Sequence, residues 1–142
     1  MTLISVHTSG HWRHSIPDLA SKIRPFFKIL VPLAIEKGIM IAIVTFSSQV
    51  NIISAVMHHE FPLIADRITI RADDHSWVYQ GGGSTDGKQR HMASAAEELG
   101  EATGQSITRN STLLVDDDAN NIKFALQNKV RAIRFIPDDP QR

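Results

Sequence analysis

Residues 111–122, STLLVDDDANNI, place an apolar run directly before three consecutive aspartates. Adjacent carboxylates repel one another, so such a group is typical of a site where a cation neutralises it. The run predicts a buried parallel strand over 112–115, and the segment after it predicts an amphipathic helix over 119–127. Open α/β sheets bind ligands at the carboxyl ends of their strands, so we expect Asp116 and Asp117 at the edge of a site. The alternative is a solvated helix N-terminus that attracts and is capped by carboxylates, and Asp118 suits such a cap better than a ligand position.

The segments around this stretch alternate between predicted strands and helices. Strands are predicted over 39–44, 67–71 and 130–136, and helices over 16–37, 50–59 and 88–99. Within the first helix, Pro25 opens the second half and Pro32 is expected to introduce a kink. Gly100 is expected to end the helix that begins at Lys88. The alternation predicts an α/β fold of the three-layer Rossmann-like type, with a mostly parallel sheet and helices on both faces.

The length and composition limit the classes of protein that remain. The 142 residues are expected to form one domain, 1–142, without a large cap domain. Lysine plus arginine equals aspartate plus glutamate at 15 each, which argues against nucleic acid and anionic membranes as partners. The absence of cysteine excludes disulfides and thiolate metal sites, and no membrane span or secretory signal is predicted. The expected location is the cytoplasm, and the sequence does not predict an oligomeric state.

Three polar features are expected to meet at one edge of the predicted sheet. Thr45 follows one apolar strand, Lys88 opens a helix, and Asp116 and Asp117 follow another strand. A hydroxyl, an ammonium and a carboxylate-bound Mg²⁺ together suit a phosphoryl group, because its transfer depends mainly on positioning and charge neutralisation. Alternatively, Thr45 is only a β-branched residue that ends a strand, and Lys88 is only a solvated lysine in the first turn of a helix. Ser47 could bind phosphate or cap the next helix.

At these positions the chain resembles the haloacid dehalogenase-like (HAD) superfamily. The second motif of that family resembles residues 41–45, IAIVT, and its third resembles residues 88–92, KQRHM. Its fourth motif, two apolar residues followed by Asp-Asp-x-x-x-Asn, matches residues 114–121. The resemblance covers nearly the whole chain and implies an HAD-like fold and a Mg²⁺-dependent phosphate-monoester hydrolase. The implied substrate is a phosphorylated small molecule or a phosphoprotein.

The resemblance also implies roles for individual residues. Asp117 would bind Mg²⁺ beside Asp116, and Asn121 would orient the acidic pair. Thr45 would donate to the phosphate, and Lys88 would neutralise it. Thr2 and Ser47 are further candidate phosphate-binding residues.

The first motif of the family, Asp-x-Asp-x-Thr, is only partly matched. Thr2 would be its threonine, and both aspartates, the nucleophile and the general acid/base, would lie before Met1. We therefore expect an incomplete first strand, weak Mg²⁺ binding and no turnover by these 142 residues. The alternative is a phosphate-binding protein without catalysis.

Two other kinds of site, a P-loop and a zinc site, would use different residues. Residues 82–88, GGSTDGK, fit the G-x-x-x-x-G-K pattern of a P-loop, but Gln89 stands where Mg²⁺ binding needs Ser or Thr. His7, His11 and His14 have a spacing that could suit zinc, although no acidic residue accompanies them at ligand spacing. Both readings remain weaker than the phosphohydrolase prediction.

Overall fold

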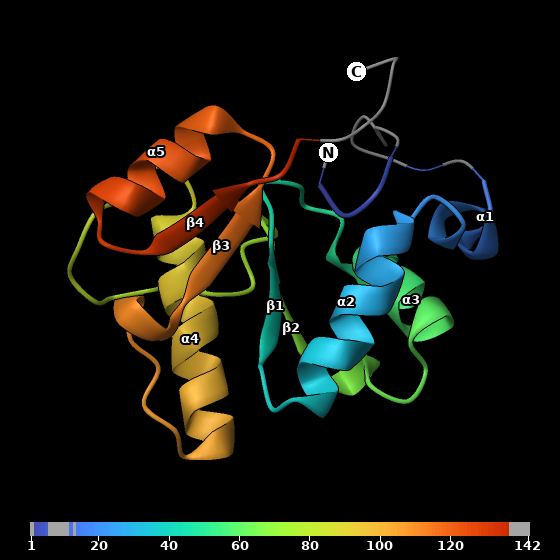
Figure 1. Ribbon diagram of the computed structural model, residues 1–142, viewed down its shortest axis with the longest axis horizontal. Helices are drawn as coiled ribbons and strands as arrows, with labels where there is room; N and C mark the ends of the chain where they lie inside the picture. Colours follow the sequence, from blue (N-terminus) through green and yellow to red (C-terminus); the bar gives the residue numbers. More distant parts are fainter. Residues whose placement is uncertain (1, 6–11, 13, 137–142) are drawn as a thin grey trace.

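The computed structural model of the protein describes residues 2–5, 12 and 14–136 (Figure 1). This part of the chain contains five α-helices, two 3-10 helices and four strands. In chain order the elements are α1 (Ile16–Ala20), α2 (Pro25–Glu36), β1 (Ile41–Val44), α3 (Val50–Glu60), η1 (Ala65–Arg67), β2 (Ile68–Arg71), α4 (Gln89–Thr103), η2 (Arg109–Ser111), β3 (Leu113–Asp116), α5 (Ala119–Gln127) and β4 (Arg131–Arg134).

The four strands pair in parallel as two separate two-stranded sheets. In the first sheet Val44 of β1 lies opposite Arg71 of β2, and in the second Asp116 of β3 lies opposite Arg134 of β4. In Figure 1 both β1 and β3 run upward, and their carboxyl ends converge near the top of the view. The sequence places Thr45 and Asp117 directly after these two ends.

The mixed α/β class with parallel strands is confirmed, whereas one continuous sheet is not seen among the described residues. No ladder of hydrogen bonds joins β1 to β3 there. Packing nevertheless connects the two sheets: Val44 of β1 contacts the cluster around Leu114, and Val115 of β3 contacts the cluster that contains Ile68. The two halves therefore share apolar contacts without sharing a strand.

The hydrophobic core is divided unequally between the two halves. The larger cluster lies between α1, α2, α3 and the first sheet, and its buried members include Leu19, Ile23, Phe27, Val31, Ile35, Met57, Phe61 and Ile68. The smaller cluster has Leu114, Ala125 and Val130 as its buried members. Because hydrophobic stabilisation grows with buried apolar area, the half formed by β3, β4 and α5 depends more on its polar contacts.

The predicted helix over 16–37 is divided into α1 and α2, and α2 continues through Pro32, where the sequence predicts a kink. Pro25 occupies its first turn, as expected from the sequence, and Pro32 lies inside it. Proline removes one helical hydrogen bond. The helix buries Phe27, Val31 and Ile35 against the larger core, and this tertiary packing offsets the missing bond.

The helix α4 ends four residues later than predicted. Gly100 continues the helix, and Gly104 ends it in the left-handed conformation with φ 71°. Its N–H donates to the carbonyl oxygen of Gly100, which closes the last turn. Two strands are shorter than predicted: β1 begins two residues after the predicted start at 39, and β4 covers only 131–134 of the predicted 130–136, the residues that pair with β3.

None of the described helices combines the length and the apolar character that crossing a membrane requires.

Candidate functional site

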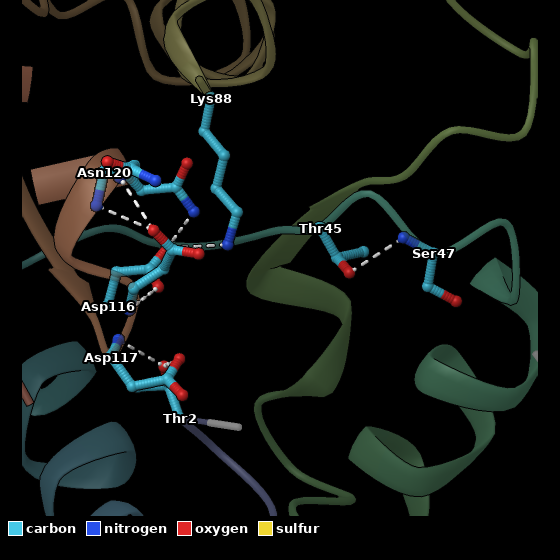
Figure 2. A network of polar contacts seen from close by, with 9 residues as sticks. Thr2, Thr45, Ser47, Lys88, Asp116, Asp117 and Asn120 are labelled. Carbon is cyan, nitrogen blue, oxygen red and sulfur yellow. Dashed lines mark hydrogen bonds and ion pairs between the residues drawn. The ribbon is translucent and has the colours of Figure 1, made fainter. Parts of the chain in front are cut away.

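Asp116 lies at the centre of a polar network at the carboxyl end of β3 (Figure 2). Its side chain is almost fully buried, at 3% exposed. One carboxylate oxygen, Oδ2, accepts hydrogen bonds from Lys88 Nζ at 2.7 Å and from Asn121 Nδ2 at 3.2 Å. The other, Oδ1, accepts from the backbone N–H of Asp118 at 2.9 Å. Three donors therefore compensate the desolvation of this charge.

Lys88 reaches this network from the residue before α4. Its side chain is 16% exposed, and Nζ also lies 5.7 Å from the centre of the Phe46 ring. Gly87 allows this approach, since its φ is +53° and a Cβ there would collide with the Phe124 side chain. The glycine thus brings the start of α4 close to α5, and with it the Lys88 ammonium to the Asp116 carboxylate.

Asp117 contacts a residue from the other end of the chain. The Thr2 hydroxyl donates to Asp117 Oδ1 at 2.8 Å, and the backbone N–H of Asp117 donates to Thr2 Oγ1 at 3.0 Å. Partial burial acts to raise the pKa of Asp117, and hydrogen bonding, including that from Thr2, outweighs it, so the net pKa lies below its ordinary value. Asp117 is therefore ionised at neutral pH and sits beside the chain segment of the partly matched first motif.

The residues after the acidic pair act as a cap and an anchor. Asp118 is the N-cap of α5, and its side chain accepts from the N–H groups of Asn120 at 2.7 Å and Asn121 at 3.2 Å. Its predicted role as a cap is confirmed. Asn121, 7% exposed, directs its side-chain amide at Asp116. Asp118 and Asn121 thus hold the acidic edge in one conformation.

Thr45 and Ser47 form a second polar group, after β1. Thr45 Oγ1 accepts from the Ser47 N–H at 3.1 Å, and Ser47 Oγ accepts from the Gln49 N–H at 3.1 Å. Figure 2 draws these two residues apart from the acidic cluster, with the Lys88 amine between the two groups. Because Thr45 Oγ1 acts as an acceptor in its bond to Ser47, its hydroxyl hydrogen remains available for a ligand.

Two residues near the site, Phe46 and Asp73, carry no clear signal in the sequence. Phe46, 49% exposed, lies between Lys88 and His91 and contacts both. Asp73 Oδ1 lies 2.6 Å from His91 Nε2, and the Trp77 ring packs edge-on against His91. In the sequence, a glycine directly before the lysine that opens a helix could have indicated that Gly87 packs closely against another element. The partners of Phe46 and Asp73 depend on the tertiary fold and could not be predicted.

Asp116 and Asp117 were both predicted as metal ligands. Both oxygens of Asp116 accept hydrogen bonds from protein groups, and Asp117 Oδ1 accepts one from the Thr2 hydroxyl. Among the described residues, no group of three or more acidic, histidine or cysteine side chains is arranged to hold a metal ion. Of the histidines proposed for zinc, His7 and His11 lie outside the described residues.

The geometry argues against a P-loop at residues 82–88. Gly82 and Gly83 line a cleft along α4, and Lys88 is not among the residues that line it. Lys88 instead directs its amine at Asp116. A P-loop requires its glycine amides and its lysine on the same phosphates, so these residues do not have the required arrangement.

Comparison of the chain with protein families, with curated proteins and with solved structures finds no match.

Proposed function

We propose that the protein is an HAD-like phosphohydrolase domain whose described residues form the phosphate- and metal-binding half of the site. The observation that carries the proposal is the ion pair between Lys88 Nζ and Asp116 Oδ2, 2.7 Å long and largely buried, at the carboxyl end of a parallel strand. It joins Lys88 and Asp116, 28 positions apart, which the resemblance assigns to the third and fourth motifs. The contact between Thr2 and Asp117 adds the residue that would be the threonine of the first motif.

A phosphate would bind between the acidic edge and the end of β1. Lys88 has three N–H donors and uses one on Asp116, so the others remain for phosphate oxygens. The Thr45 hydroxyl can donate from the opposite side, because Ser47 already holds its oxygen. The exposed ring of Phe46 lies beside Lys88 and would exclude water from one side of the ligand.

Mg²⁺ fits this arrangement with Asp117 as a protein ligand. Asp117 is ionised and partly exposed, and Mg²⁺ commonly binds one or two carboxylates while water and phosphate oxygens complete its shell. When bound, the ion would neutralise negative charge on the phosphoryl group. Asp116 and Asn121 would keep the Asp117 backbone in place.

Catalysis requires a nucleophile and a general acid/base, two aspartates that the resemblance places before Met1. A strand leading to Thr2 would lie between β1 and β3 and would complete a three-layer, Rossmann-like sheet. Two features support this placement: β1 and β3 are unpaired with each other, and α2 exposes a stripe of Phe26 (53%), Ile29 (70%) and Leu33 (46%). Phe26 stacks on Phe135, just after β4, so this stripe begins beside the second sheet.

Phosphate binding by the 142-residue chain tests the proposal. Titration with inorganic phosphate in the presence of Mg²⁺, followed by ³¹P NMR, should show weak binding. Replacing Lys88 with Gln should weaken it about tenfold or more, since a hydrogen bond to a charged group contributes about 1.5–3 kcal/mol. Thr45→Val should weaken it by a smaller factor.

Gly82→Ala is the matched control. A Cβ at Gly82 meets no atom within 4 Å, and Gly82 does not contact Lys88 or Asp116 in the proposed site, so phosphate binding should be unchanged. Equal loss of binding in Lys88→Gln and Gly82→Ala would favour the P-loop. Wild-type binding that does not respond to Lys88→Gln or Thr45→Val would contradict the proposed site.

A further inference from the structure

A cleft of about 610 Å³ runs along α4, separate from the proposed phosphate site. Lys88, Asp116 and Thr45 are not among its lining residues. Ala93 and Ala96 of α4 line it together with Val130, and the loop that contains Gly82 and Gly83 forms one side. Its volume is within the range of ligand sites, about 300–1,000 Å³. The cleft is therefore large enough to bind a ligand of its own.

Two arginines line the cleft and reach the loop that precedes α4, Arg90 at Tyr79 and Arg109 at Gly83. Arg109 opens η2, which a reciprocal cap between Thr108 and Ser111 stabilises. Its guanidinium lies against the bare backbone of Gly83, where φ is +110° and a Cβ would come within 3.0 Å of Arg109 Nη2. Arg90 lies in the first turn of α4 and makes only a long contact, 3.5 Å, to a backbone carbonyl oxygen. Neither arginine forms an ion pair with another described residue.

Two glutamates line the cleft farther along α4. Glu97 and Glu101 are 7 and 11 residues after Arg90, which corresponds to about 10 and 16 Å along a helix. Their neighbour Glu98 pairs with Arg71 at 3.1 Å on another face of the helix. Glu97 and Glu101 form no ion pair within the described part of the chain. The cleft thus has uncompensated positive charge at one end and negative charge at the other.

We propose that this cleft binds an extended peptide segment of a partner protein, with an acidic side chain at the arginine end and a basic one at the glutamate end. An extended chain advances about 3.3 Å per residue, so a separation of 10–16 Å corresponds to three to five residues. The alanines of the floor and the bare glycine backbone admit small apolar side chains and the peptide backbone. This inference does not depend on the phosphohydrolase activity.

One buried donor at the cleft supports a peptide as the ligand. Gln89 lines the cleft, and its side-chain nitrogen is buried without a hydrogen-bond partner among the described residues. Unsatisfied buried donors destabilise a protein, and a peptide carbonyl oxygen is a suitable acceptor. Charge at the two ends would set the position of the peptide, because complementary charges determine register more than affinity.

Fluorescence anisotropy with a labelled heptapeptide tests this inference. The probe has two aspartates, then Ala-Val-Ala, then two lysines, and it should bind the 142-residue chain with an affinity that falls as salt increases. Arg109→Gln and Glu101→Gln should each weaken binding about fivefold. Arg67→Gln removes an exposed arginine outside the cleft and should leave binding unchanged. Circular dichroism confirms that each variant folds.

A second peptide distinguishes a mixed-charge ligand from a simple anion. Replacing both lysines of the probe with glutamine should weaken binding to the wild type and should abolish the effect of Glu101→Gln. The inference is overturned if the heptapeptide does not bind, or if both cleft variants bind it as the wild type does. It is also overturned if the lysine-free peptide binds more tightly, since the cleft would then select an anion alone.

Discussion

Asp116 links the stability of the fold to the proposed chemistry at the scale of single residues. It is the buried acceptor for Lys88, Asn121 and the backbone of Asp118. It therefore joins α4, α5 and β3, in the half of the molecule with the smaller hydrophobic core. The same contacts set the position of Lys88 and the backbone that carries Asp117.

We expect Asp116→Asn to reduce the free energy of unfolding by about 3 kcal/mol. The new side-chain NH₂ would face the donors of Lys88 and Asn121, and the buried ammonium would lose its counter-charge. Urea denaturation measures the change. Asp86→Asn, an exposed substitution close to Lys88 in the chain, is the control and should change the stability by less than about 0.5 kcal/mol. An equal effect of the two substitutions would contradict the assigned role.

His58 should have a raised pKa. The hydrogen bond to Asp66 raises it most, and the bond to the Ser54 carbonyl oxygen adds to this effect. Nε2 lies 2.8 Å from Asp66 Oδ1 and Nδ1 lies 2.8 Å from Ser54 O, so both ring nitrogens face acceptors and favour the doubly protonated ring. Because the folded pKa is the higher one, the stabilisation is fully present below the unfolded pKa and disappears as pH rises through the folded pKa.

An NMR titration of the His58 ring protons measures this pKa. In Asp66→Asn the pKa should return toward 6.5, the ordinary value for histidine. His59, the next residue along α3, provides an internal reference in both proteins. A His58 pKa that is the same in the wild type and in Asp66→Asn would show that the ion pair does not form.

At the scale of elements, α5 depends on the cap that Asp118 provides. The helix has nine residues and contributes Ala125 and Asn121 as its buried side chains. Isolated helices of this length are unstable, so the cap and the tertiary contacts are both needed. We expect Asp118→Ala to lower the free energy of unfolding by about 1 kcal/mol, measured by urea denaturation.

Asn120→Ala is the control for this substitution. Asn120 is exposed in the first turn of α5, and only its backbone N–H contacts the cap. Alanine has the higher helix propensity, so this variant should be as stable as the wild type or slightly more stable. Equal destabilisation by Asp118→Ala and Asn120→Ala would show that the capping bonds do not contribute.

At the scale of the whole molecule, the two separate sheets predict the effect of an added strand. We expect an apolar strand ending in Asp-x-Asp, placed directly before Met1, to raise the melting temperature. It would pair with β1 and β3 and would bury exposed apolar surface at roughly 25 cal/mol per Å². The extended protein should hydrolyse an aryl phosphate with Mg²⁺, whereas the 142-residue chain should not.

Changing the first added aspartate to asparagine separates these two effects. Turnover should be abolished, since the nucleophile is lost, while most of the gained stability remains. An extended protein that melts no higher than the 142-residue chain would contradict the proposed position of the strand. Turnover by the 142-residue chain itself, lost in Asp117→Ala, would contradict the role assigned to the added aspartates.

The sequence alone was sufficient for the α/β class, the approximate positions of the strands and the cap at Asp118. These features depend on local patterns: continuous apolar runs, helical spacing, and an aspartate before a helix. The continuation of α2 through Pro32 was not predictable, because it depends on how Phe27 and Val31 pack against distant residues. The end of α4 was also not predictable, because both Gly100 and Gly104 could end a helix and the local sequence does not distinguish them.

By itself, the sequence determined which residue types stand at the ends of the strands, since Thr45, Asp116 and Asp117 each follow an apolar run. Only the tertiary structure decided how these groups divide their roles. It turned Lys88 toward Asp116, brought Thr2 to Asp117 across 115 positions, and separated Gly82 from Lys88. The physical reason is that hydrogen bonds and desolvation depend on distance in space, and residues remote in the chain supply the partners that make Asp116 a buried anchor and hold Asp117 beside Thr2.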